Sequence, residues 1–364
     1  MVRQPQKSGG TRCLAVVRTP LQLINASEYI YEHGIERATL VVIRNSRKWG
    51  FSVFQSVPSM ALWGEVIEFH WADNIFNKDS SYPALRILGD LYDDARFSRF
   101  FVKARKDWSD LDVLIIGNTN DLWLRHLANS LNDRRALVEC EDGAATLNSN
   151  WVPTKSWSLR KVLNGFDAKD PCLDEVYTSY DGVSLAGVEV KKNRYGYIRS
   201  LFDQGELKVS EDVWFVGQPL TELALMSRDA YLASVLAVKN NYAGHGRFIY
   251  CPHPSESENN VRSLCSALGV DCLNTNSIIE VSILASDNVP ARVASFYSSA
   301  ISTVIGIFSG KVCVDVYRPD RELFEDKMRA DTYEEVYGAF RKIINGENNF
   351  YRISKGSYSV FLSH

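Results

Sequence analysis

Short apolar runs alternate with helical patterns along the chain, and this alternation limits the possible fold more than any other feature. In the first part of the sequence, residues 21–31 predict a helix that begins at Pro20, a residue suited to a helix's first turn. Strands that alternate with such helices favour a parallel sheet with helices on both faces. Five apolar runs are expected to be buried strands of this sheet: residues 14–17, 39–43, 65–69, 112–117 and 135–140.

The same alternation returns in the second part of the chain, after a stretch from 151 to 212 in which the periodicity fades. A strand over 213–216 is followed by a predicted helix from 220 to about 238. The 364 residues exceed one ordinary domain. We therefore expect an α/β protein with two Rossmann-like domains facing a central cleft. The expected boundaries are 1–205, 206–345 and a tail over 346–364. Further βα segments are expected at 248–251, 261–268, 278–284, 293–297 and 312–316, followed by a last helix over 333–344.

The amino-acid composition excludes some classes of protein function. The chain is 45% hydrophobic and 23% charged, with a net charge of -3 and scattered Lys and Arg, which argues against a nucleic-acid binder. No apolar stretch has the length of a signal peptide or a membrane span. Seven cysteines, several inside strand-like runs, favour reduced thiols. We expect a cytoplasmic protein, with peripheral association at the inner face of the membrane left open.

His253 stands between Pro252 and Pro254, directly after the apolar run 248–251. A strand closed by proline ends where it reaches solvent, so His253 is expected at the carboxyl end of a strand. Ligands of open α/β sheets bind at that edge, and histidine exchanges protons near neutral pH. A lone histidine at a strand end also fits a structural role.

Glu141-Asp142-Gly143 ends another predicted strand. Gly143 permits a tight turn that leaves a carboxylate at the sheet's carboxyl edge. Two adjacent carboxylates repel each other, which raises the pKa of one and makes it a better proton acceptor. Acids also cap the helix that follows a strand, so this motif has a structural reading as well.

Ser298-Ser299 lies between an apolar run and a helical pattern. Serine hydroxyls and unbonded amides at a helix start make an anion site, although paired serines are common as plain caps. Glu280 lies within the apolar segment 278–284. A carboxylate there needs a partner, and either a pair of sugar hydroxyls or a nearby arginine would serve.

Other chemistries find little support in the motifs. HExxH, paired CxxC, GxGxxG and GxxxxGK[ST] do not occur. Asp110-Leu111-Asp112 has the spacing of a metal-binding DxD motif, but it precedes its strand where that motif follows one. We therefore expect no metal site and no cofactor.

Taken together, the motifs resemble those of bacterial sialyltransferases of the GT-B type, namely the lipooligosaccharide sialyltransferase and polysialyltransferase families. These families share a D/E-D/E-G motif, an HP motif and a paired-serine motif, in the order seen here. In this sequence, 112 residues separate Glu141 from His253, and 45 separate His253 from Ser298. Ile279-Glu280 is similar to the family's ribose-binding acid. The likeness extends from residue 13 to about 310, and also includes Arg18 to Leu23 and Val216 to Leu220.

The resemblance implies the GT-B fold and inverting, metal-independent transfer of sialic acid from CMP-Neu5Ac to an acceptor hydroxyl. Glu141 or Asp142 would be the general base, with Glu141 favoured by its place in the motif, and His253 the general acid. Glu280 would hold the ribose. The remaining donor contacts would be Pro254, Ser298, Ser299, Gly217, Gln218 and Pro219, and the acceptor side of the cleft would be formed by Thr19, Pro20, Gln22, Asn118 and Gly143.

Several alternatives stay open. The sugar could be another nonulosonic acid, such as legionaminic or pseudaminic acid, and the donor could be CMP-Kdo or a UDP-sugar. The chain could also be a non-catalytic protein that binds a nucleotide or a glycan. The expected acceptor is a bacterial cell-surface glycan, either lipooligosaccharide or capsule, met by loops around 74–82 and 151–157. Single addition, polymerisation and oligomeric state are undecided by the sequence.

Overall fold

The chain divides into two compact units in the structure, which is a computed structural model. The first unit comprises Met1–Thr178 and Ser184–Tyr197, and the second Ser179–Val183 and Ile198–His364. The structure describes residues 10–44, 51–70, 106–119, 121–131, 136–143, 171–181, 183–203, 208–273, 277–286, 288–308, 310–326, 349–353 and 360–362, with single positions and short pieces within 95–103 and 333–342.

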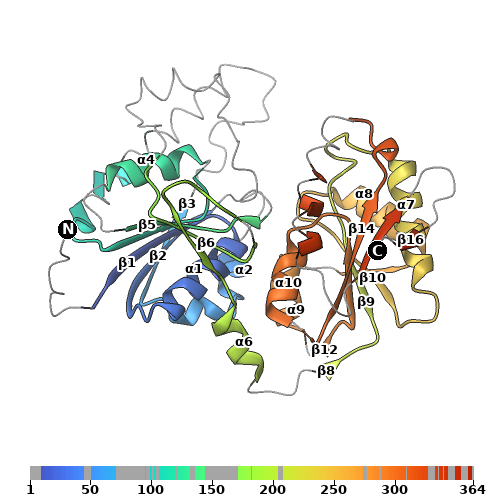
Figure 1. The fold of residues 1–364 in the computed structure, drawn as a ribbon, viewed down its shortest axis with the longest axis horizontal. Coiled ribbons are helices and arrows are strands. Elements are labelled where there is room, and N and C mark those ends of the chain that lie inside the picture. The colour runs from blue at the N-terminus through green and yellow to red at the C-terminus, as the bar shows by residue number, and fades with distance from the viewer. Residues whose placement is uncertain are drawn as a thin grey trace. The chain divides into compact units, whose positions relative to one another are not determined.

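A seven-stranded parallel sheet forms the centre of the first unit, in the order β3-β2-β1-β4-β5-β6-β7 (Figure 1). The five strands expected from the sequence are all present. Two more, β6 and β7, lie where the sequence periodicity fades. The strands are β1 (Arg12–Val17), β2 (Arg37–Arg44), β3 (Glu65–His70), β4 (Val113–Ile116), β5 (Ala136–Cys140), β6 (Glu175–Thr178) and β7 (Glu189–Lys192).

Helices cover both faces of this sheet, with α1 on one face and α4 on the other (Figure 1). The Thr19 hydroxyl caps α1 by accepting from the Gln22 amide, and Pro20 occupies the first turn as expected. Leu14, Val16 and Leu114 pack with α4 in one apolar cluster. The helices of this region are α1 (Pro20–Glu32), α2 (Phe51–Gln55), the 3-10 helix η1 (Pro58–Leu62) and α4 (Leu122–Ser130), and α6 (Gly196–Asp203) begins in the first unit and continues into the second.

The second unit contains a sheet of the same plan, in the order β11-β10-β9-β13-β14-β15-β16. Its strands are parallel except β16, which runs antiparallel to β15. A separate two-stranded sheet joins β8 (Lys208–Val209) to β12 (Asn288–Val289). The strands of the main sheet are β9 (Val213–Val216), β10 (Phe248–Cys251), β11 (Asp271–Cys272), β13 (Arg292–Ser295), β14 (Cys313–Pro319), β15 (Asn349–Ile353) and β16 (Val360–Leu362).

The C-terminal segment differs from the expected tail over 346–364. It contributes β15 and β16 to the main sheet, where β15 pairs with β14 over five residues and Ile353 is fully buried. Local sequence gives a weak signal here, because both strands are short and their partners are other strands: β15 pairs with β14, and β16 pairs with β15. The second unit therefore extends beyond residue 345.

The helices α7 and α8 cover one face of the second sheet, and α9 and α10 cover the other (Figure 1). The helix expected from 220 begins at Arg228, because Ser227 caps it by accepting from the Ala230 amide and residues 220–226 form turns. The apolar segment 278–284 is mostly helical. The described positions between 333 and 342 are helical, as expected. The helices are α7 (Arg228–Asn241), α8 (Glu258–Leu268), α9 (Ile279–Leu284), α10 (Ala300–Phe308) and the 3-10 helix η4 (Arg321–Leu323).

Each sheet reverses its strand order once, between β1 and β4 in the first unit and between β9 and β13 in the second. In open α/β sheets, ligands bind at the carboxyl ends of the strands beside such a reversal. The two carboxyl edges are therefore the places to look for chemistry. In the part of the chain that the structure describes, no helix is long and apolar enough to cross a membrane.

Candidate functional site

The carboxyl edge of the first sheet brings three separate loops together. Val16 of β1 is in register with Ile116 of β4, which is in register with Glu139 of β5. When neighbouring parallel strands end at the same level, the loops that follow them leave the sheet side by side. Thr19, Asn118 and Asp142 are thereby gathered beside the reversal between β1 and β4.

Asp142 is the carboxylate at the centre of this edge. Its Oδ2 accepts a hydrogen bond of 3.0 Å from Asn118 Nδ2, and its Oδ1 lies 3.5 Å from the Thr19 hydroxyl. The residue is half-buried. Two neutral donors from two other loops thus orient its carboxylate.

The electrostatic setting of Asp142 favours a proton acceptor. Burial raises the pKa of Asp142, while hydrogen bonds from Asn118, Gln22 and Thr19 and the charge of Arg18 lower it, and the net direction is upward. Burial also lowers the pKa of Arg18, which forms an ion pair with Asp121. A carboxylate with a raised pKa holds a proton more readily than an ordinary aspartate does.

Glu141 lies in a different environment, although it is the neighbouring residue. Its side chain is 0% exposed, and its Oε2 accepts a hydrogen bond of 2.8 Å from the Thr178 hydroxyl at the end of β6. Its backbone carbonyl accepts from Asn25 Nδ2 at 2.9 Å. Gly143 follows with φ of 68°, a left-handed conformation that suits glycine. Burial therefore favours Asp142 over Glu141 as the residue that can meet a substrate.

A buried polar stripe on α1, formed by Gln22, Asn25 and Glu28, supports this edge, and of these only Gln22 was expected from the sequence. Gln22 Oε1 accepts from the Arg18 amide at 2.7 Å, and Asn25 Oδ1 accepts from Asn193 Nδ2 at 3.0 Å. Glu28 Oε2 accepts from the Tyr197 amide at 2.8 Å. Gln22, Asn25 and Glu28 recur every three residues in a mostly apolar helix, so the periodic placement of these polar residues was the available signal.

The carboxyl edge of the second sheet is built in the same way. Cys251 of β10 and Ser295 of β13 are both in register with Val216 of β9. The loops that carry His253, Gln218 and the two serines therefore leave the sheet side by side. They flank the reversal between β9 and β13.

His253 is half-buried and Pro254 is exposed. The imidazole Nδ1 of His253 accepts a hydrogen bond of 3.0 Å from the Ser255 amide, and the His253 amide donates to Glu256 Oε2 at 2.6 Å. An Nδ1 that accepts an N–H places the proton of the neutral ring on Nε2. His253 is thus arranged to donate a hydrogen bond from Nε2.

Gln218 is nearly buried, and its Oε1 accepts from the Tyr297 amide at 3.3 Å across the reversal. Its neighbour Pro219 is half-buried. Gly217 has no room for a side chain, since a Cβ there would lie 2.3 Å from the Tyr250 hydroxyl and 2.5 Å from Glu256 Oε2. The glycine lets the backbone pass close to these two groups.

Ser298 and Ser299 precede α10. The Ser298 hydroxyl accepts from the Ala300 amide at 3.3 Å, so it caps the helix. The Ser299 carbonyl accepts from the amide and the hydroxyl of Ser302, at 3.1 Å and 2.8 Å. A capping hydroxyl keeps its own hydrogen for a further acceptor, which is compatible with an anion beside the helix start.

Glu280 is buried, with 3% of its surface exposed, in the first turn of the short helix α9. The loops 74–82 and 151–157, expected to meet an acceptor, lie outside the described residues.

The predicted site residues thus fall into two groups, one at the carboxyl edge of each unit. Glu256, Tyr231 and Tyr250 join the second group and were missed, because nothing in their local sequence distinguishes them from ordinary surface and core residues.

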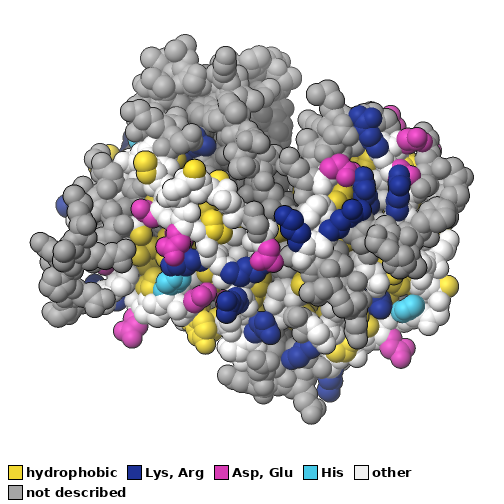
Figure 2. Space-filling view, viewed as in Figure 1, with side chains coloured by type: hydrophobic (Ala, Val, Ile, Leu, Met, Phe, Trp, Pro, Cys, Tyr) yellow, Lys and Arg dark blue, Asp and Glu magenta, His cyan; other side chains and the backbone are white. Residues whose placement is uncertain are grey.

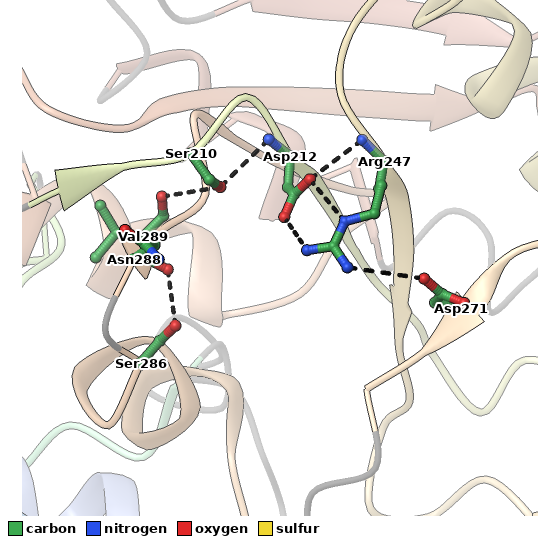
Figure 3. A network of polar contacts seen from close by, with 7 residues as sticks. All are labelled: Ser210, Asp212, Arg247, Asp271, Ser286, Asn288 and Val289. Carbon is green, nitrogen blue, oxygen red and sulfur yellow. Dashed lines mark hydrogen bonds and ion pairs between the residues drawn. The ribbon is translucent and has the colours of Figure 1, made fainter.

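A cavity of about 370 Å³ opens at the opposite end of the second sheet, where Asp212 precedes β9 and Arg247 precedes β10. Figure 3 shows these two residues in a network of polar contacts. Asp212 accepts from Arg247 Nε and Nη2 at 3.2 Å and 2.7 Å, and Asp271 lies 4.0 Å from the same guanidinium. The charged lining is therefore already paired. Trp214, Ile249 and Ser286 also line this cavity.

Charges on the face seen in Figure 2 are mixed in sign, as the composition led us to expect. In the second unit, Arg318 pairs with Glu334 at 2.7 Å and Arg352 pairs with Asp320. Among the described residues, no group of three or more His, Cys, Asp or Glu side chains is arranged to hold a metal ion.

No protein-family model matches the chain, and no curated protein matches its sequence. Solved structures do resemble its fold. A candidate UDP-N-acetylglucosamine 2-epimerase of Listeria monocytogenes matches with a TM-score of 0.50 at 11% identity, over 85% of this chain and 79% of that one. UDP-GlcNAc 2-epimerase of Neisseria meningitidis bound to UDP-GlcNAc has a TM-score of 0.44 at 12% identity, over 92% and 91%.

UGT89C1 of Arabidopsis thaliana complexed with UDP-L-rhamnose has a TM-score of 0.49 at 9% identity, over 98% of this chain and 88% of that one. At such identities the likeness concerns the fold alone. Together with the two doubly wound parallel sheets, the likeness to the Listeria monocytogenes structure establishes that the chain has the expected GT-B fold of two Rossmann-like units.

Proposed function

We propose that the protein is an inverting glycosyltransferase that moves sialic acid, or a related nonulosonic acid, from a CMP-activated donor to a hydroxyl of a bacterial cell-surface glycan. The observation that carries this proposal is the placement of the motif residues. Asp142 lies at the reversal of the first sheet, and His253 and Ser298 lie beside the reversal of the second. Ligands of open α/β sheets bind at such edges.

Asp142 is the general base of the proposed reaction. It takes the proton of the acceptor hydroxyl, whose oxygen bonds to the anomeric carbon of the donor as the bond from that carbon to the CMP phosphate oxygen breaks. Attack from the face opposite CMP inverts the anomeric configuration. The hydrogen bonds that Asp142 accepts from Asn118 and Thr19, together with its raised pKa, suit the role of a base, whereas Glu141 is fully buried.

The departing CMP phosphate is stabilised by the loops of the second unit. The Nε2–H of His253 donates to a phosphate oxygen, and the hydroxyls of Ser298 and Ser299 and the start of α10 complete the anion site. Glu280 accepts from the ribose hydroxyls. In this scheme the leaving charge is met by fixed donors, so the transfer proceeds without a metal ion.

The test is selective stabilisation by nucleotides followed by a transfer assay. CMP should raise the melting temperature more than UMP, UDP or GDP, with or without EDTA, since a ligand at 100 times its Kd adds about 2.7 kcal/mol. Incubation with CMP-Neu5Ac and a panel of terminal galactosides, read by mass spectrometry, should yield a sialylated product. Stabilisation by UDP and Mn²⁺ alone would overturn the proposal.

A different nucleotide sugar is the second candidate. The structure from Listeria monocytogenes that shares this fold is assigned to a UDP-N-acetylglucosamine reaction, which is the reason for the UDP arm of the test. CMP-Kdo, CMP-legionaminic acid and CMP-pseudaminic acid would give the same nucleotide preference as CMP-Neu5Ac. The transfer assay separates these donors.

A further inference from the structure

A chain of hydrogen bonds runs beneath the second carboxyl edge and connects the loop after β9 to the loop after β10. The Gln218 amide donates to the Tyr231 hydroxyl at 3.0 Å, and the hydroxyls of Tyr231 and Tyr250 are 2.9 Å apart. The Tyr250 hydroxyl donates to Glu256 Oε1 at 2.6 Å. The other oxygen, Oε2, accepts from the His253 amide at 2.6 Å.

The two ends of this chain determine the direction of every bond in it. The Tyr231 oxygen accepts from an amide, so its hydrogen is available for Tyr250. The Tyr250 hydrogen is then available for Glu256, and a carboxylate accepts at both of its oxygens. With Glu256 ionised, both hydroxyls donate once and accept once. A proton on Glu256 Oε1 would reverse the Tyr250 bond and leave the Tyr231 hydrogen without an acceptor in this chain.

The surrounding residues enclose this chain of hydrogen bonds. Tyr231 and Tyr250 are 3% and 0% exposed, and the backbone of Gly217 lies against the Tyr250 hydroxyl and Glu256. The amide of Gly217 also donates to the Cys251 carbonyl at 2.8 Å, so the two loops are joined at two levels. The same two loops carry Gln218 and His253.

The pKa of Glu256 is raised to about 7, chiefly by burial and also by the charge of Glu222, against hydrogen bonds from Tyr250 and His253 that lower it. The other ionisable groups that face it are Tyr231 on α7, Cys265 on α8 and Cys272 on β11. The population of the carboxylate therefore changes across the neutral range.

We propose that Tyr231, Tyr250 and Glu256 are positioning residues that hold the His253 loop against the Gln218 loop, and that they do so fully only when Glu256 is a carboxylate. The proposal rests on the function proposed above for the second carboxyl edge. It adds a specific support for His253, because the carboxylate fixes the amide of the residue whose ring faces the leaving group. Loosening this support would misplace the Nε2–H donor, and small misplacements cost up to about a hundredfold in rate.

Tyr250→Phe tests the middle of the chain. It should lower kcat by about 10- to 100-fold while the KM for the acceptor stays unchanged, because the donor loops lose their connection. Tyr231→Phe and Glu256→Gln interrupt the same chain and should act in the same direction. Wild-type kcat in Tyr250→Phe, at an unchanged melting temperature, would overturn the proposal, and if that variant fails to fold the other two decide.

Tyr242→Phe is the matched control. The Tyr242 hydroxyl donates to buried Asp315 Oδ2 at 2.6 Å in the same unit, away from the two donor loops. Its loss should lower the melting temperature and leave kcat at the wild-type value. A fall in kcat equal to that of Tyr250→Phe would show a general effect of destabilisation and overturn the proposal.

The pH profile tests the ionisation of Glu256. The wild-type rate should rise through a transition near neutral pH as Glu256 loses its proton, and Glu256→Gln should lack this transition while keeping the one that belongs to Asp142. An identical profile in the variant and the wild type would overturn the role of the carboxylate. A purely structural hydrogen bond would not move the profile.

A measurement without ligand separates this proposal from the proposed function. Nitrogen-15 NMR of the His253 ring, assigned with His253→Ala, should show a protonated Nε2 and an accepting Nδ1 in the wild type. Tyr250→Phe should shift both nitrogens toward the average of the two tautomers. Unchanged shifts would overturn the positioning role even if CMP binds, whereas absent CMP binding with the expected shifts would overturn only the proposed function.

Discussion

Asp142 and Glu141 show how two adjacent carboxylates acquire different properties from their surroundings. Asp142 is oriented by Asn118 and Thr19 at the sheet edge, while Glu141 is enclosed and accepts from Thr178. Both residues follow β5, at the point where the chain leaves the sheet, so these neighbours in sequence meet different environments. The residue that resembles the family's base by its place in the motif is therefore not the one that geometry favours.

Exchanging each carboxylate for its amide separates these roles. Asp142→Asn should lower the transfer rate by about 10²- to 10⁴-fold with little change in melting temperature, because it removes the proton acceptor. Glu141→Gln should lower the melting temperature and keep most of the activity, since it disturbs a buried hydrogen bond. Initial rates and thermal melts of both variants check this. The reverse pattern, with Glu141→Gln inactive and stable, would return the base to Glu141.

At the scale of the elements, a glycine directly follows one of the two strands that border the reversal of strand order in each unit. Gly117 follows β4 and Gly217 follows β9, and a Cβ at Gly117 would lie 2.1 Å from Gln22 Cδ. Each glycine therefore allows a polar side chain of another element to pass under the loop. The close approach, rather than an unusual backbone angle, accounts for both residues.

Gly117→Ala should displace Gln22 and with it the donors around Asp142. Overpacking of this kind costs about 1–3 kcal/mol, so the variant should have a lower melting temperature and a much lower transfer rate. Gly64→Ala is the control, because a Cβ at Gly64 would meet only the Ala38 carbonyl at an ordinary 3.6 Å. Thermal melts and initial rates of the two variants make the comparison. Equal activity in both would contradict the packing argument.

At the scale of the whole molecule, several half-buried acids have raised pKa values, and these link stability to pH. Burial is the first cause for Glu139, Asp142 and Glu256 alike. A raised pKa means that the folded state binds the proton more tightly than the unfolded state does. The stabilisation from such a group is fully present below its unfolded pKa and is lost as pH rises through its folded pKa.

For Glu256 the window runs from 4.5, the ordinary value, to about 7. The loss over this window corresponds to up to roughly 3 kcal/mol. The wild-type protein should therefore melt at a lower temperature at pH 8 than at pH 5, and Glu256→Gln should lose less stability over the same range. Calorimetry at both pH values measures the difference. An equal loss in the two proteins would mean that Glu256 is not desolvated in the fold.

The sequence alone determined the two-unit α/β architecture and the strands β1 to β5. A strand that is buried between helices on both faces needs a continuous apolar run, and such a run can be recognised in the sequence. It also determined that Glu141, Asp142 and His253 follow strands. Tertiary structure decided what local patterns do not contain. The segment expected to be a tail became β15 and β16, since their hydrogen-bond partners lie in β14 and in each other.

Tertiary structure also decided the roles within the motifs. The partners of Asp142 and Glu141 lie 24, 37 and 123 residues away in sequence, at Asn118, Thr178 and Thr19. Tyr231, Tyr250 and Glu256 come from a helix, a strand and a loop. Hydrogen bonds and desolvation depend on groups that only folding brings together, and these set which carboxylate meets solvent and which supports the histidine.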